Sequence, residues 1–334
     1  MKRTLSFFTL ALLCHFVNAQ DTATFKKRAM ALITDKFPVT RTFDIQYQQY
    51  LPGNFDSELY DRHFSKAKIQ THYRLKVAAN IPLLETKKWR ITGSANYRYE
   101  AFKFKDVEAA PNFAEAGLDN NKHEFHYFSG AISATYFSVL FKKPVIYTAS
   151  IIVDGSEKDI ERLNGFVSAT MFLKRNRQTR IGVGVMAFID PAMQIPFAPI
   201  IMIEHQFRNA VWTMDLILPQ RLLFKRPIFE NGRLSIGSEL ANDNFYTYPN
   251  SSLFKSKVYD YRQLELRSGI TYEHKLNSFI IATFKTGVSN VFSSRLSARG
   301  ESSKNYVLST TAGAAGYFSV GLSFNPSLKK KKQP

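Results

Sequence analysis

The chain has 334 residues, with 45 Lys and Arg against 27 Asp and Glu, a formal net charge of +18, and 14% aromatic residues at a mean hydropathy of −0.21. A single cysteine excludes a disulfide-stabilised fold, and beyond the N-terminus no stretch approaches the roughly 18–20 apolar residues of a membrane-spanning helix. Many aromatic residues on a chain that is polar on average are typical of a membrane β-barrel, whose apolar residues occupy alternate positions.

Residues 1–19 are predicted to be a secretory signal peptide. Lys2 and Arg3 precede an apolar core, and Val17-Asn18-Ala19 forms a small-residue cleavage site. Cys14 invites the alternative of a lipoprotein, but leucine stands directly before it, where that processing needs a small side chain. The protein is therefore expected to be exported.

The excess of positive charge restricts the partners. Removal of Lys2 and Arg3 with the signal lowers the formal charge from +18 to +16. An exported protein rarely meets nucleic acid, so we expect no nucleic-acid partner. Outer-membrane lipid, phosphate-rich lipopolysaccharide and small solutes are the predicted partners, and the sequence holds no motif for a cofactor.

The mature chain divides into three segments. Residues 20–39 predict a periplasmic lead or a small plug at the barrel mouth, residues 40–325 the barrel itself, and residues 326–334 a basic periplasmic tail. The Lys329–Lys332 run in this tail is typical of a solvated segment, with anionic lipid as an alternative contact.

The first predicted strands are long. Thr40–Tyr50 alternates between apolar and polar residues, Pro52–Phe64 is predicted to be a long polar connection, and Ser65–Ile81 alternates over 17 residues. Strands of globular proteins usually have about 5–6 residues, whereas membrane strands need about 9–11 and can project beyond the bilayer. The length of the second strand therefore favours a membrane barrel.

Two aromatic residues of the third strand agree with the height of a bilayer. Trp89 and Tyr99 lie ten positions apart on the same face. At about 3.3 Å per residue and a tilt near 40°, they stand roughly 25 Å apart along the membrane normal. This distance matches the apolar band between the two aromatic girdles of such barrels.

Ten further strands follow before the last one. They are predicted at Phe125–Phe141, Val145–Val153, Gly165–Lys174, Arg180–Phe188, Ile200–Phe207, Val211–Leu218, Leu222–Pro227, Arg233–Leu240, Tyr261–His274 and Phe279–Ser289. Long connections, among them Ala241–Tyr259 and Val291–Ala314, alternate with short ones, as outer loops and inner turns do. Only Pro219–Arg221 is short where an outer loop belongs. The predicted count is fourteen, or twelve if that hairpin is one bent strand.

Tyr317–Phe324 is predicted to be the closing strand. Phe318, Val320, Leu322 and Phe324 lie on one face, and Tyr317, Ser319, Gly321 and Ser323 on the other. It resembles the C-terminal strand of bacterial outer-membrane proteins, whose final aromatic residue is recognised by the barrel-insertion machinery, although ten residues follow Phe324 here.

Barrel width decides which face meets lipid. A soluble barrel would turn the apolar face inward, but with twelve or more strands it would enclose a void too wide for side chains to fill. A β-sandwich does not explain strand length together with alternating loop length. The sequence therefore predicts an all-β fold: a transmembrane, antiparallel, up-and-down β-barrel in the cell outer membrane.

The whole mature chain resembles outer-membrane β-barrel families of uncharacterised function found in Bacteroidota. The resemblance rests on Asn18-Ala19 before Gln20, the RTFDIQYQQYLP stretch from Arg41, the region from Ile195-Pro196-Phe197 to Leu218-Pro219, and the terminal YFSVGLSF. It implies a fold and a compartment without an assigned activity.

The polar face of the strands is the candidate functional surface. By parity it carries Lys68, Arg74, Lys76, Arg90, Arg98, Glu100, Glu204, Asp215, Glu239, Glu265, Arg267 and Lys285. Basic residues outnumber acidic ones, which predicts a passive, porin-like channel or uptake barrel with an anion-leaning lumen. The alternative is a closed structural barrel in which these charges form cross-strand salt bridges.

Signals of enzyme chemistry are weak, and the protein is predicted not to be an enzyme. His63 and Ser65 have a spacing that could place a base beside a nucleophile at the outer rim, which leaves a rim esterase or lipid-modifying enzyme as an alternative. His123 and His126 are three positions apart and fall on opposite faces of a strand, so no metal site is predicted.

Overall fold

The computed structural model describes residue 37 and residues 40–111, 120–176, 178–190, 193, 196–208 and 211–326. They form one antiparallel sheet of strands: β1 (Phe43–Tyr50), β2 (Gly53–Leu59), β3 (Arg62–Glu85), β4 (Trp89–Ala109), β5 (Lys122–Leu140), β6 (Lys143–Gly155), β7 (Ile160–Arg175), β8 (Thr179–Ile189), β9 (Phe197–Gln206), β10 (Thr213–Leu218), β11 (Arg221–Ile228), β12 (Gly232–Thr247), β13 (Tyr259–Lys275), β14 (Ile280–Ala298), β15 (Tyr306–Ala312) and β16 (Ala315–Phe324). Within these ranges no helix is long and apolar enough to cross a membrane. The predicted signal peptide, nearly all of the predicted lead and nearly all of the basic tail lie outside them.

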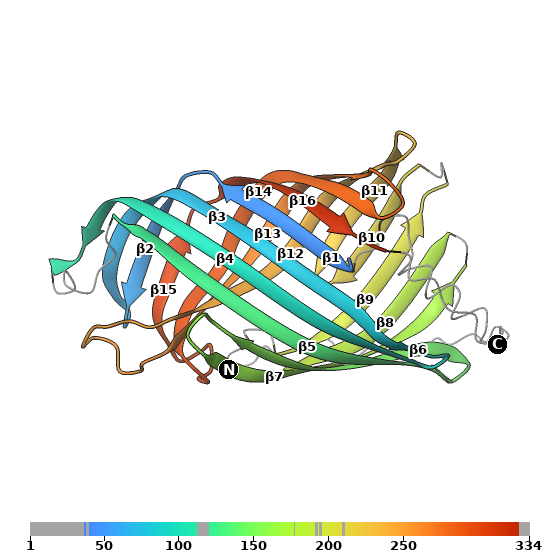
Figure 1. Ribbon diagram of the computed structural model, residues 1–334, viewed down its shortest axis with the longest axis horizontal. Coiled ribbons are helices and arrows are strands. Elements are labelled where there is room, and N and C mark those ends of the chain that lie inside the picture. Colours follow the sequence, from blue (N-terminus) through green and yellow to red (C-terminus); the bar gives the residue numbers. More distant parts are fainter. Residues whose placement is uncertain are drawn as a thin grey trace, which may run out of the picture.

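The sheet closes into a barrel of fourteen strands (Figure 1). β1 and β2 lie end to end along β3, and β16 and β15 lie end to end along β14. Each pair is therefore one barrel strand with an interruption, and β1–β16 and β2–β15 pairing closes the ring. The predicted count of fourteen is confirmed, and the alternative of twelve is wrong because β10 and β11 pair as two separate strands.

Two predicted long connections are wrong. Most of Pro52–Phe64 forms β2 and the start of β3, joined by Tyr60 and Asp61 at positive φ. Most of Val291–Ala314 forms the end of β14 and the whole of β15. In β2 the usual polarity is inverted, because Phe55 lines the interior whereas Asn54 and Glu58 are exposed outside, and the residues Pro52, Gly53, Asn54 and Asp56 are those typical of a loop.

The barrel is apolar outside and polar inside. Large apolar side chains are exposed on the outer surface, including Ile132 at 61%, Ile151 at 63% and Leu322 at 56%, whereas Arg74 and Glu265 are buried at 1% and 0%. This reverses the arrangement of a soluble protein. A closed sheet pairs the backbone groups of neighbouring strands around the whole ring, and with a lipid-facing apolar surface it defines a transmembrane β-barrel.

The cross-section is flattened. β5 and β12 lie seven places apart in either direction around the ring, yet they are in contact, and the Phe125 and Phe245 rings stack with centroids 4.0 Å apart. A row of glycines, Gly237, Gly269 and Gly287, crosses the neighbouring strands at paired positions. At Gly269 a Cβ atom would lie 2.1 Å from the backbone oxygen of Thr286, so this close approach of strands requires glycine.

The barrel wall is uneven in height. β3, β4 and β5 have 24, 21 and 19 residues and run along nearly the whole barrel in Figure 1, whereas β9, β10 and β11 have 10, 6 and 8. The two-residue connection 219–220 joins the shortest pair, so the predicted exception to the loop rule is real. The tall wall extends the lumen outward on one side.

Candidate functional site

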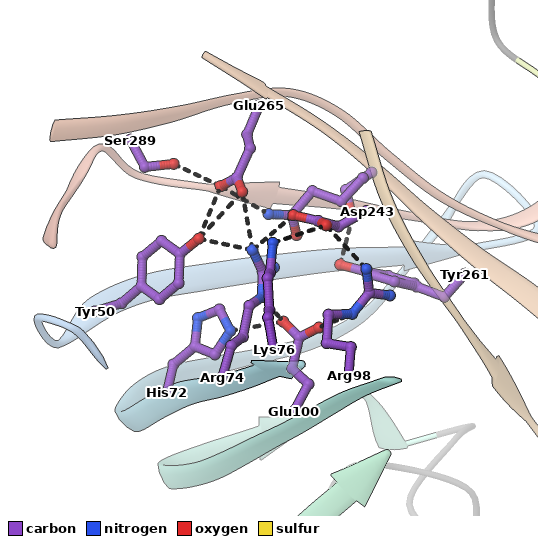
Figure 2. Close-up of polar contacts among 12 residues, drawn as sticks. Tyr50, His72, Arg74, Lys76, Arg98, Glu100, Asp243, Tyr261, Glu265 and Ser289 are labelled. Atoms are coloured by element: carbon purple, nitrogen blue, oxygen red, sulfur yellow. Dashed lines mark hydrogen bonds and ion pairs between the residues drawn. The ribbon is translucent and has the colours of Figure 1, made fainter. Parts of the chain in front are cut away.

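A network of charged side chains crosses the lumen at mid-height, with Arg74 at its centre (Figure 2). Nη1 of Arg74 donates to Tyr50 Oη at 2.7 Å, to Asp243 Oδ2 at 2.9 Å and to Glu265 Oε1 at 2.9 Å. Its Nε donates to Glu100. One guanidinium from β3 thus joins β1 and β4 on one wall to β12 and β13 on the other.

The remaining members complete this mid-lumen network. Lys76 and Arg98 bind Asp243 at 3.2 and 2.9 Å, and Arg267 pairs with both Asp243 and Glu265. Four cations therefore face three carboxylates, Glu100, Asp243 and Glu265, and each carboxylate has at least one cationic partner. Charges that are paired in this way join the two walls of the barrel across the lumen.

An apolar cavity of about 190 Å³ lies on the outer side of the network. The side chains that make its wall are Phe55, Phe64, Phe102, Phe104, Phe125 and Phe245. Polar side chains also line it, among them His123, Gln263 and Thr310. At the floor His72, Glu265 and Ser289 meet the network, and Ser289 Oγ donates to Glu265 Oε2 at 2.6 Å. We call this space the outer cavity.

The inner side of the network is different in character. A polar space of about 420 Å³ lies there, lined by charged side chains that include Asp44, Arg221, Lys225, Glu239, Glu273 and Lys285. We call it the inner vestibule. The lumen is therefore divided into an apolar outer compartment and a charged inner one, with the mid-lumen network between them.

Polar contacts also bridge the outer mouth. Arg162 on β7 binds Asp260 on β13 at 2.8 Å, which crosses the lumen a second time. The connection 248–258 is held at its start and at its middle, because Tyr248 donates to Glu161 at 2.5 Å and the Tyr60 hydroxyl donates to the Leu253 carbonyl at 2.9 Å. Burial raises the pKa of Tyr248 to about 12, so its hydroxyl remains a donor to Glu161.

The outer cavity reaches the barrel surface at the seam between the first and last strands. Leu51, which lines the cavity, is 55% exposed on the outside, and Gly313 lines it from the interruption between β15 and β16. Pro52 has no N–H to donate, which explains the interruption of β1 and β2. Across the gap Leu51 N donates to Gly316 O at 2.8 Å and Gly313 N donates to Asn54 O at 3.3 Å.

Six of the twelve predicted lumen residues meet in the mid-lumen network: Arg74, Lys76, Arg98, Glu100, Glu265 and Arg267. The other pairs are more local. Asp215 binds Arg221 and Lys225, Glu239 binds Lys285 at 3.4 Å, Glu204 binds Arg180 at 3.1 Å, and Arg90 binds Glu85.

The predicted lumen position of Lys68 is wrong. Register shifts in the β3–β4 pairing, one of them between Ile69 and Thr71, change which face alternate residues occupy. Ile69 therefore lines the outer cavity with His72, and Lys68 is exposed on the outer surface. Counting alternate residues along the sequence assigns the wrong face after a β-bulge, because the extra residue of the bulge cannot be seen in the sequence.

His63 and Ser65 do not form a catalytic pair in this geometry. His63 lies 3.4 Å from Asp56, and both side chains are about half exposed. Ser65 is fully buried and its hydroxyl lies 2.9 Å from that of Ser57. A register shift beside Phe64 separates the two, and no hydrogen bond joins them in the described part of the chain.

Three members of the site were missed by sequence reasoning. Asp243 falls inside the predicted connection Ala241–Tyr259, but β12 continues to Thr247 and therefore includes it. His72 and Tyr50 share the polar parity and would have been found by listing all polar side chains rather than the charged ones. They stack at 4.2 Å under the outer cavity.

The closed barrel, its apolar surface and its charged lumen define a β-barrel of the outer-membrane class. No protein-family model and no curated protein matches the chain. It is similar to a FadL homologue from Pseudomonas aeruginosa, at 9% identity over 87% of this chain and 91% of that one, with a TM-score of 0.41. An outer membrane channel from Pseudomonas putida F1 is 8% identical over 87% of this chain and 98% of that one, with a TM-score of 0.36. The outer membrane protease OmpT from Escherichia coli is 10% identical over 87% of this chain and 99% of that one, with a TM-score of 0.27. At these values the similarity does not extend to function, and the predicted Bacteroidota family remains a prediction.

Proposed function

We propose that the protein is an outer-membrane uptake barrel that binds a small, mainly apolar molecule in the outer cavity. The observation that carries this proposal is the aromatic wall of the cavity inside a lumen that is otherwise polar. Water fills a wide polar lumen readily, whereas a concave apolar space with a few polar groups is typical of a ligand site.

Size and chemistry restrict the ligand. A cavity of about 150 Å³ accepts benzene, so about 190 Å³ has room for a substituted ring. The only charged side chain among the lining residues, Glu265, is already paired with Arg74 and Arg267. The ligand is therefore uncharged, and a hydroxyl or carbonyl group on it would meet His72 or Ser289 at the floor.

The mid-lumen network would then act as the barrier that a ligand must pass to reach the inner vestibule. The anion-leaning channel of the sequence analysis remains a second candidate, and the closed structural barrel a third. Single-channel conductance in a planar bilayer distinguishes them. Because the lumen charges are paired, we expect no stable open steps; stable steps with anion preference would favour the channel.

Filling the outer cavity tests ligand binding directly. Gly53 lies on the face of β2 that carries Phe55 and Ser57 toward the cavity, and a Cβ atom there has no neighbour within 4 Å. Gly53→Phe is expected to weaken binding of 4-fluorophenol at least about tenfold, because the ring occupies the ligand space. Fluorine NMR of the refolded barrel in phosphatidylcholine nanodiscs measures this, with empty nanodiscs subtracted.

The matched control is Glu58→Phe, which places the same ring at an exposed position of the same strand. It should bind like the unmodified protein. If 4-fluorophenol does not bind to the unmodified barrel beyond its partition into nanodiscs, or binds equally to the Gly53→Phe barrel, the outer cavity is not the ligand site.

A further inference from the structure

Four lysines gather on the outer surface of the tall wall. Lys68 on β3 and Lys105 on β4 are directly paired positions, and so are Lys103 on β4 and Lys122 on β5. All four are exposed. The register shifts of β3 that turn Lys68 away from the lumen are what bring it into this group, which we call the lysine patch.

Few carboxylates neutralise the positive charge of the lysine patch. Lys122 pairs with Glu124, and the nearby Lys66 pairs with Asp56 at 3.6 Å. The side chains of Lys68, Lys103 and Lys105 have no ion pair or hydrogen bond with any part of the chain that the structure describes. Like charges at directly paired positions destabilise a sheet, so an anion bound from outside the chain would stabilise this arrangement.

The height of the patch suits a lipid headgroup. Tyr73 and Tyr99 lie on the same outer surface with ring centroids 5.8 Å apart, and Nζ of Lys122 stands 5.7 Å from the Tyr73 ring and 5.8 Å from the Tyr99 ring. Tyrosines in this position mark the boundary of the bilayer. Lys103 is four residues further out along β4, roughly 10 Å along the membrane normal.

We propose that the lysine patch binds the phosphorylated sugar headgroup of the glycolipid in the outer leaflet. Sugar-linked phosphates extend further from the hydrocarbon than the phosphate of a glycerophospholipid, which matches the position of Lys103 and Lys105 beyond the tyrosines. Adjacent ammonium groups on a rigid sheet neutralise two neighbouring phosphates without a change in backbone conformation.

The test compares the full barrel with a variant in which Lys68, Lys103 and Lys105 are replaced by glutamine. Each lysine near an anionic surface contributes a favourable binding free energy. Losing three of them is expected to weaken binding of the anionic lipid about a hundredfold. Bis-phosphorylated lipid A, added to phosphatidylcholine vesicles, is expected to raise the thermal unfolding midpoint of the unmodified barrel and not that of the variant. In phosphatidylcholine alone the variant should be at least as stable, because lysine repulsion is relieved.

Three controls make the outcome decisive. The combined substitutions Lys87→Gln, Lys88→Gln and Lys142→Gln, at exposed positions of the inner turns, change the charge equally and should leave the lipid A effect intact. The charge-conserving variant Lys68→Arg, Lys103→Arg and Lys105→Arg should also retain it. The proposal is overturned if the patch variant keeps the lipid A effect, if the inner-turn variant loses it equally, or if phosphatidylglycerol stabilises the unmodified barrel as much as lipid A does.

Discussion

Replacing Arg74 by methionine is expected to destabilise the barrel by about 3–5 kcal/mol, because the change leaves buried carboxylates without their shared cation. Arg74 is 1% exposed and binds Glu100, Asp243 and Glu265 at once. Methionine fills similar volume, so the loss measures charge compensation rather than a cavity. Urea unfolding of the barrel from phosphatidylcholine vesicles gives the free energy.

The matched control for this prediction is Arg180→Met. Arg180 pairs with Glu204 at 3.1 Å, but the two side chains are 30% and 38% exposed, so the expected loss is about 0–1 kcal/mol. Equal losses at the two positions would mean that the mid-lumen network contributes no more than a surface ion pair.

The same variant tests whether the network is the barrier across the lumen. Without the Arg74 guanidinium, the link between β3 and the opposite strands β12 and β13 is weakened, and water can enter between the walls. Single-channel recordings in a planar bilayer are expected to show conductance steps for Arg74→Met that Arg180→Met lacks. A folded but silent Arg74→Met barrel would place the barrier elsewhere.

Gly269→Val is expected to have the second large effect. An added Cβ atom would lie 2.1 Å from Thr286 O and 2.8 Å from the Cα of Gly287, and both are backbone atoms that side-chain rotation cannot move. The strands must therefore separate, which costs at least about 2–3 kcal/mol. We expect most of the protein to lose the heat-shifted gel mobility of a folded barrel.

Gly130→Val on β5 serves as the comparison. Its nearest neighbour to an added Cβ atom is Ser94 O at 4.0 Å, so the barrel accepts the side chain. A folded fraction for Gly269→Val equal to that for Gly130→Val would show that the flattened wall does not depend on the glycine row.

The sequence by itself determined the class of fold and the strand count. Apolar residues at every second position must face one medium, and strands as long as Ser65–Ile81 exceed what a soluble sheet uses. The short connection at Pro219 could also be predicted, because proline at a tight turn ends a strand regardless of its surroundings. These are local properties of the chain, and the structure confirms them.

Only the tertiary structure decided what fills the lumen. Alternation places Arg74 and Glu265 on the inner face, but their contact depends on flattening of the barrel, which brings β5 against β12. Register shifts in the β3–β4 pairing place Lys68 on the outer surface instead of in the lumen. Asp243 lies in β12, because this strand continues into the segment that was predicted to be a connection. Contacts between strands four to seven places apart in a ring are set by its cross-section, and no short stretch of sequence encodes that shape.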